Sequence, residues 1–209
     1  MQKDLVELVF IVDRSGSMSG IASDMEGAIE SVLKDQKKNH KGDIRVTFVR
    51  FDTDYEEVFS NKSIDEIEDK IAIKPRGMTA LLDAMGKTIN TFERRISETD
   101  EEDRPKRVLF LIITDGAENA SNEYSREKVF GMIKTLERDH QWKFTFIGAN
   151  QDAIAEGGNI GISRGDSLNF QATSKGVRDM SMNVTDYTTS YFSTGMASYE
   201  DVDEDVDEA

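Results

Sequence analysis

The chain of 209 residues contains no cysteine, so it can form neither a disulfide bond nor a metal site with thiolate ligands. The apolar run near the N-terminus ends at Asp13, which makes it too short for a membrane span. It also lacks a small-residue cleavage site, so we expect no signal peptide. These absences favour a reducing compartment, and we expect the protein to be cytoplasmic.

Positive charge is scarce and histidine is rarer still. The formal net charge is -15, and Glu200 to Glu208 contributes seven acidic residues, which leaves -8 for the rest of the chain. An acidic surface without a basic stripe repels phosphate groups, so we expect neither nucleic acid nor an anionic membrane as a partner. His40 and His140 fall near the ends of expected helices, and neither neighbours a nucleophile in a known motif, which favours structural roles.

The proportion of apolar residues decides between a folded and a disordered chain. Apolar and aromatic residues make up 37% of the sequence, which is enough to build a core, and the length fits a single α/β domain. From Ser198 onward, acidic residues surround two isolated valines, and their like charges repel one another. We therefore predict one domain over residues 1–197 and a disordered acidic tail over residues 198–209.

Apolar runs predict the strands. Residues 5–12 and 107–113 are almost continuously apolar, which indicates strands covered on both faces. Residues 44–51 and 55–59 are joined by a short connection and therefore predict an antiparallel hairpin. Two further strands are expected at residues 143–147 and 167–170.

Amphipathic helices are expected between these strands. Apolar residues recur at helical spacing over 21–36, 82–96, 129–136 and 177–191, and Ser125 is expected to cap the third of these helices. The alternation of strands and helices predicts an α/β fold of the Rossmann-like, doubly wound type. Its six-stranded sheet should be mostly parallel, with one antiparallel edge strand and helices on both faces.

Oxygen-bearing side chains follow two of the predicted strands. Asp13 and Asp115 each stand directly after a strand, and ligands of such folds bind at the carboxyl ends of the strands. Those two strands should be neighbours, so the two carboxylates would approach and repel one another unless a cation lies between them. Ser15 and Ser17 follow Asp13 at alternate positions and can face the same point, with Gly16 allowing a close turn.

Thr79 supplies another hydroxyl at the start of a predicted helix. Mg²⁺ prefers about six oxygen ligands, and hydroxyls and carboxylates both qualify, while Mn²⁺ and Ca²⁺ accept similar donors. Other interpretations exist: Ser15, Ser17 and Thr79 could merely cap helices, and Asp115 could merely form a turn. Asp52 and Asp54 are expected only to shape the hairpin. The candidate metal ligands are Asp13, Ser15, Ser17, Thr79 and Asp115.

These residues resemble the metal-ion-dependent adhesion site of the von Willebrand factor type A domain family, whose pattern is Asp-x-Ser-x-Ser, a separate Thr and a separate Asp. The similarity extends from residue 5 to about residue 192. Gly77-Met78-Thr79-Ala80-Leu81 and Thr114-Asp115-Gly116 are similar to bacterial-type cytoplasmic members. The resemblance implies that the three hydroxyls bind the ion, that the two carboxylates bind it directly or through water, and that a sixth position stays open.

The resemblance implies a metal-dependent protein-binding module in which an Asp or Glu of the partner completes the coordination of the ion. A first alternative is a Mg²⁺-dependent phosphoryl-transfer or hydrolytic enzyme. The sequence contains no phosphate-binding Gly-x-x-x-x-Gly-Lys-Ser/Thr loop, no Asp-x-Asp after the first strand and no obvious general base, so we expect no catalysis. A second alternative is a structural metal site in a larger assembly with an ATPase partner.

Overall fold

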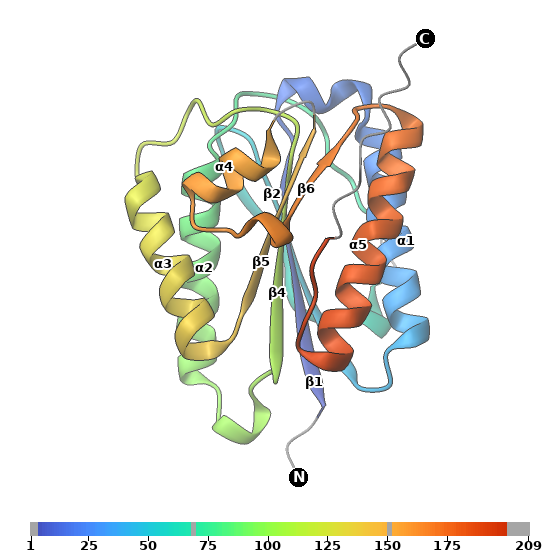
Figure 1. Cartoon of the computed structure of the whole chain (residues 1–209), viewed down its shortest axis with the longest axis vertical. Helices are drawn as coiled ribbons and strands as arrows, with labels where there is room; N and C mark the ends of the chain where they lie inside the picture. Colours follow the sequence, from blue (N-terminus) through green and yellow to red (C-terminus); the bar gives the residue numbers. More distant parts are fainter. Residues whose placement is uncertain (1–3, 68–69, 150–151, 200–209) are drawn as a thin grey trace.

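The computed structural model describes residues 4–67, 70–149 and 152–199, which form a central sheet covered by helices on both faces (Figure 1). The six strands are arranged in the order β3-β2-β1-β4-β5-β6. Their bounds are β1 Leu5–Asp13, β2 Asp43–Phe51, β3 Tyr55–Ser63, β4 Arg107–Thr114, β5 Lys143–Ala149 and β6 Ser167–Phe170. Only β3 pairs antiparallel, which confirms the predicted doubly wound sheet with one antiparallel edge strand.

The two central strands, β1 and β4, are the most apolar parts of the chain. They pair in parallel, with Val12 opposite Ile113 at their carboxyl ends. Almost every side chain of both strands is buried because helices cover both faces. Burial of branched and aromatic side chains on both faces is what a continuous apolar run requires. The ends of β1 and β4 are thereby fixed side by side.

The edge strand β3 is irregular. Its register with β2 shifts on both sides of Phe48, and Asn61 adopts a left-handed backbone conformation with φ 52°. These features bend the strand, as β-bulges do. The strand also extends to Ser63, four residues beyond the predicted end.

The helices pack in two layers. On one face α1 and α5 cover the sheet, and on the other face lie α2, α3 and α4 (Figure 1). The bounds are α1 Ala22–Asn39, α2 Leu81–Glu98, α3 Arg126–His140, α4 Ala153–Asn159 and α5 Ser174–Thr194. Short 3₁₀ helices are η1 Gly16–Gly20, η2 Ile64–Glu66, η3 Glu101–Asp103 and η4 Arg164–Asp166.

Two details of the helices test the sequence predictions. Ser125 caps α3 as predicted, because its side chain accepts a hydrogen bond from the backbone N–H of Lys128. The sequence analysis did not predict α4, which contains Gly157-Gly158. Gly157 packs so tightly that a Cβ there would lie 2.6 Å from the Ser167 hydroxyl, so close packing against β6 favours glycine within this helix.

The chain after α5 returns along the body. The backbone N–H of Tyr199 donates to Gly165 O at 2.7 Å, and its ring stacks on Tyr187. The division between a domain over 1–197 and an acidic tail stays a prediction, and residues 200–209 of that tail lie outside the described ranges. No helix in the described part of the chain is both long and apolar enough to span a membrane.

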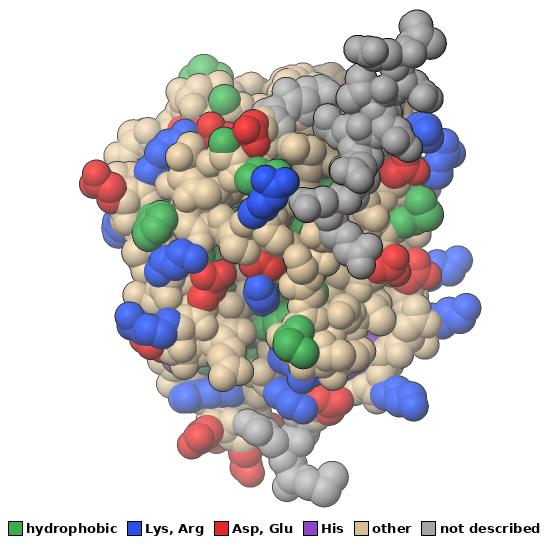
Figure 2. Space-filling view, in the orientation of Figure 1, with side chains coloured by type: hydrophobic (Ala, Val, Ile, Leu, Met, Phe, Trp, Pro, Cys, Tyr) green, Lys and Arg blue, Asp and Glu red, His purple; other side chains and the backbone are tan. Residues whose placement is uncertain are grey.

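Acidic and basic side chains are interspersed on one face of the molecule. Figure 2 shows Lys and Arg mixed with Asp and Glu on the face turned to the viewer. Several of these charges form ion pairs across elements, including Lys87 with Glu123 and Arg126 with Glu156. Exposed pairs of this kind contribute about 0–1 kcal/mol each, so they add little to the stability of the fold.

Candidate metal centre

The predicted site residues lie on three loops at the carboxyl ends of the strands. Asp13 is the last residue of β1 and begins the motif loop, residues 13–17. Asp115 follows Thr114, the last residue of β4. Thr79 lies in the loop of residues 76–80 that precedes α2, called here the Thr79 loop.

Asp13 is a fully buried carboxylate (0% exposed), and among the described residues it forms no ion pair. Its Oδ1 accepts the backbone N–H of Ser15 and its Oδ2 accepts the hydroxyl of Thr114, both at 2.6 Å. Burial raises the pKa of Asp13 to about 6, the two hydrogen bonds oppose that rise, and nearby Asp115 adds to it. The position therefore contains negative charge that no protein cation offsets.

The two serines link Asp13 to Asp115. The hydroxyls of Ser15 and Ser17 are 3.0 Å apart, and Ser17 donates to Asp115 Oδ1 at 2.6 Å. Burial raises the pKa of Asp115 above its usual value, although the hydrogen bond from Ser17 opposes the rise. Two carboxylates and two hydroxyls thus share one small region.

Thr79 reaches the same region from its own loop. The space beside Gly116 shows this, because a Cβ placed on that glycine would lie 3.2 Å from Thr79 Oγ1, 3.6 Å from Ser17 Oγ and 3.9 Å from Asp13 Oδ2. Oxygen atoms of the Thr79 loop and of the motif loop therefore lie within 4 Å of one point beside Gly116. Oxygen-only donors of this kind fit a hard divalent cation.

Acidic and histidine side chains alone do not form such a site in the described part of the chain. Within residues 4–67, 70–149 and 152–199, no three His, Cys, Asp or Glu side chains gather in a group that could hold a metal ion. A site here would therefore depend on hydroxyl oxygens as well as on the two carboxylates, as the sequence predicted.

Helix capping does not account for the hydroxyls. Ser15 precedes η1 but makes no side-chain capping bond. The residue that caps α2 is Ala80 rather than Thr79, and it offers no side-chain acceptor. The hydroxyl groups of the motif loop instead contact one another and Asp115.

Asp52 has a second role that was not predicted from its position in the hairpin. Its Oδ1 does accept the backbone N–H of Asp54 at 2.6 Å, which shapes the hairpin as expected. Its Oδ2 additionally accepts Nε of Arg14 at 2.8 Å and Nε of Arg76 at 2.7 Å. These arginines belong to the motif loop and the Thr79 loop, so one buried carboxylate joins two parts of the candidate site.

The loop after Asp115 is fastened to the first turn of α2. The Asp83 carboxylate accepts the backbone N–H groups of Asn122, Glu123 and Tyr124 at 2.8–3.0 Å. Burial works to raise the pKa of Asp83, but these three donors lower it below its usual value. From the other side, Glu118 accepts the backbone N–H of Leu82 at 3.0 Å. The helix residue Asp83 thus binds the backbone of the loop, and the loop residue Glu118 binds the backbone of the helix.

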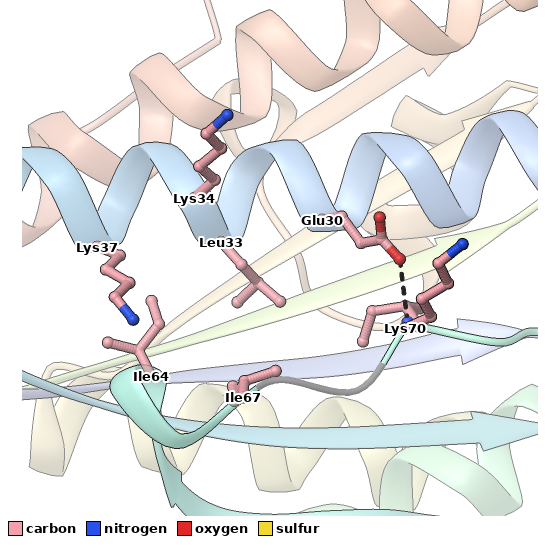
Figure 3. Close-up of a pocket in the computed structure, with 8 residues that line it drawn as sticks. Glu30, Leu33, Lys34, Lys37, Ile64, Ile67 and Lys70 are labelled. Carbon is pink, nitrogen blue, oxygen red and sulfur yellow. Dashed lines mark hydrogen bonds between the residues drawn. The ribbon is translucent and has the colours of Figure 1, made fainter.

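A pocket elsewhere is not this site. It lies between α1 and the segment that follows η2, and none of the five predicted ligands lines it (Figure 3). One acidic residue there, Glu30, is already engaged by the backbone N–H of Ile71 at 3.2 Å. The lining residues are Glu30, Leu33, Lys34, Lys37, Ile64, Ile67, Lys70 and Ile71.

Comparisons with known proteins identify a family. The model of the von Willebrand factor type A domain matches residues 7–187. Among solved structures, proximal thread matrix protein 1 from the mussel byssus, with a zinc-occupied MIDAS motif, is 17% identical and has a TM-score of 0.64. The similar region covers 90% of this chain and 47% of the mussel protein, so the chain spans less than half of that relative.

Two bacterial proteins have the same fold. The pilus adhesin SpaC from Lactobacillus rhamnosus GG, in its open conformation, is 13% identical with a TM-score of 0.67, covering 90% of this chain and 30% of the adhesin. The vWF domain of the pilus tip protein Mfa5 from Porphyromonas gingivalis is 10% identical with a TM-score of 0.59, covering 88% and 96%. No curated protein matches the sequence. At these identities the likeness shows the fold alone.

Proposed function

Because the chain belongs to the von Willebrand factor type A domain family, we propose that it binds a divalent metal ion at the described cluster and, through that ion, a partner protein. The observation that carries the proposal is the convergence of oxygen atoms of Asp13, Ser17 and Thr79 beside Gly116, with Asp115 hydrogen-bonded to Ser17. The proposed ligands are Asp13, Ser15, Ser17, Thr79 and Asp115.

The charges of the cluster suit this role. Asp13 and Asp115 together offset the two positive charges of a divalent ion. The ion would in turn offset the free-energy cost of burying the Asp13 carboxylate and its repulsion from Asp115. The three hydroxyl ligands are neutral, so they coordinate the ion without adding charge to the site. When bound, the ion supplies a Lewis-acidic position to which an Asp or Glu of the partner can attach. We propose Mg²⁺ as the ion, since all the donors are oxygen atoms, and Mn²⁺ and Ca²⁺ accept the same donors.

We infer a binding module rather than an enzyme, and the positions of the two histidines support this inference. The chain has two histidines and no cysteine. His40 precedes β2 and His140 precedes β5, so both lie near the amino ends of strands, whereas the cluster lies at the carboxyl ends. The hydroxyls of the cluster therefore have no histidine beside them to act as a general base.

Titration calorimetry with Mg²⁺ tests the metal site. Thr79→Val removes one proposed ligand at nearly constant volume. Thr88→Val is a matched control, because Thr88 is equally buried (2% exposed) and its hydroxyl bonds Ala84 O and Tyr55 Oη, neither of which belongs to a proposed ligand. We expect Thr79→Val to weaken Mg²⁺ binding strongly and Thr88→Val to leave it unchanged. Equal Mg²⁺ affinity in both folded variants would refute the proposed ligand set.

Partner binding requires a separate experiment. Proteins captured by the wild type in Mg²⁺ are compared with those captured in EDTA and by Asp13→Ala and Asp115→Ala. We expect the metal-dependent partners to be absent from all three comparisons. If the folded variants capture the same proteins as the wild type, the chain does not bind partners through the ion.

A further inference from the structure

The Asp52 carboxylate connects two loops of the candidate metal site. It is 2% exposed and lies in the turn between β2 and β3. Arg14, the second residue of the motif loop, reaches it from one side, and Arg76, the first residue of the Thr79 loop, reaches it from the other. Charge-assisted bonds of this kind are about twice as strong as neutral ones, so the carboxylate holds both loops.

Backbone contacts reinforce the connection. The carbonyl oxygen of Asp52 accepts the N–H of Ala80 at 3.0 Å, directly after Thr79. The two loops also bond to each other, through Arg76 N–H to Arg14 O at 2.7 Å and Gly16 N–H to Gly77 O at 3.2 Å. Both ends of the Thr79 loop are thus bound to Asp52 or to the motif loop.

Gly77 allows this close approach. Its backbone is left-handed, with φ +68°, and a Cβ there would lie 3.2 Å from both Cβ and Cγ of Asp52. A larger residue would be strained and would push the loop away from the carboxylate. The position of Thr79 therefore depends on contact between its loop and Asp52.

The same contacts keep the positive charge of Arg14 away from the candidate metal site. Arg14 stands between Asp13 and Ser15 in sequence, where a free guanidinium would repel a cation. Its side chain instead donates to Asp52 and to Glu56 and is buried between them. Hydrogen bonds from Asp54 and Arg76, together with the charge of Arg14, lower the pKa of Asp52 despite its burial, so the carboxylate stays ionised.

We infer that Asp52 is a positioning residue for the metal site, setting the separation of the motif loop from Thr79 without contacting the ion. The inference rests on the proposed function, because it concerns the same metal ligands. A positioning role differs from a purely structural one in its consequences. Loss of Asp52 should weaken metal binding by more than the loss of an equally buried carboxylate far from the site.

Asp166 provides that matched control. It is 3% exposed, its carboxylate bonds Lys143 at 2.8 Å, and it directly precedes β6 at the opposite end of the sheet. Asp52→Asn and Asp166→Asn each remove a buried, ion-paired charge. Arg76→Gln is a milder second variant, because Arg76 is 57% exposed and the fold does not depend on its burial.

Mg²⁺ affinity by calorimetry is the first measurement. We expect Asp52→Asn and Arg76→Gln to weaken binding by about 10- to 100-fold, as residues that orient metal ligands usually do, and Asp166→Asn to change it less than about twofold. Equal affinity in the wild type and Asp52→Asn overturns the inference. So does an equal loss in Asp52→Asn and Asp166→Asn.

Amide hydrogen exchange of the metal-free protein is the second measurement. We expect faster exchange at Gly77 to Ala80 in Asp52→Asn and Arg76→Gln, but not in Asp166→Asn. If the wild type shows no Mg²⁺ binding, the proposed function fails, and exchange alone then decides whether Asp52 holds the loop. Unchanged exchange in both Asp52→Asn and Arg76→Gln overturns the inference whatever the calorimetry shows.

Discussion

Asp13→Asn should make the metal-free protein more stable while abolishing metal binding. The Asp13 carboxylate is fully buried, and its pKa rises from the ordinary 3.8 to about 6. That difference corresponds to roughly 3 kcal/mol of unfavourable free energy for the ionised group at neutral pH. Asparagine carries no charge, so this cost disappears.

The surroundings can accept asparagine. Its carbonyl oxygen can still accept the N–H of Ser15, and its amide can donate to Thr114 Oγ1. The Thr114 proton can then turn to Gly116 O, which is already within 3.0 Å. We therefore expect Asp13→Asn to raise the free energy of unfolding by about 1–3 kcal/mol, since little hydrogen bonding is lost.

The sign of the pH dependence follows from the raised pKa. A group with a higher pKa in the folded state contributes stability below its unfolded value of 3.8, and this contribution is lost as pH rises through about 6. The difference between Asp13→Asn and the wild type should therefore be small at pH 4 and fully developed at pH 7.5.

Urea unfolding at both pH values, in EDTA and in Mg²⁺, measures these terms. At an Mg²⁺ concentration of about 100 times the dissociation constant, the wild type should gain roughly 2.7 kcal/mol and Asp13→Asn nothing, which offsets or reverses the difference between them. If Asp13→Asn is clearly less stable than the wild type in EDTA at pH 7.5, Asp13 is a structural residue and the electrostatic reasoning is wrong.

Three further variants separate the site from the fold. Gly116→Ala places a methyl group 3.2 Å from the hydroxyl of Thr79, and the backbone of Gly116 is not left-handed. Mg²⁺ affinity should therefore fall while the melting temperature stays nearly constant. An unchanged Mg²⁺ affinity by calorimetry would show that the ion lies elsewhere. Thr114→Val removes a donor to Asp13, which should raise the pKa of that carboxyl further and shift the pH midpoint of Mg²⁺ binding upward; a midpoint that stays or falls contradicts this. Lys143→Met leaves the Asp166 carboxylate without its cation, and the free energy of unfolding in urea should fall by about 3 kcal/mol. Mg²⁺ affinity should be retained. A loss of that affinity would mean that the two ends of the sheet are coupled.

Residues next to each other in sequence account for most of what could be predicted. The strands at 5–12 and 107–113 are recognisable from apolar runs alone, and Asp13 and Asp115 stand directly behind them. Since parallel neighbours end at the same edge of a sheet, the approach of these two side chains follows from the topology. Thr79 was predicted because a helix was expected to begin there, and in the structure it lies two residues before the first residue of α2, Leu81.

Contacts between distant residues could not be predicted in this way. Arg14 and Arg76 are 38 and 24 residues from Asp52, and nothing in the local sequence distinguishes them from solvent-exposed arginines. Asp52 itself looks like an ordinary turn residue, which it also is. The helix α4 was missed for a related reason, because its two glycines disfavour a helix locally while packing against the sheet favours it.

The irregular edge strand limits how another protein can approach. A long, flat edge offers unpaired backbone groups to which a foreign strand can add. Here β3 is bent by its register shifts and by Asn61, and the opposite edge, β6, is only four residues long. Extension of the sheet by a partner strand is disfavoured at both margins, and the proposed recognition would therefore use side-chain oxygens at the strand ends rather than the peptide backbone.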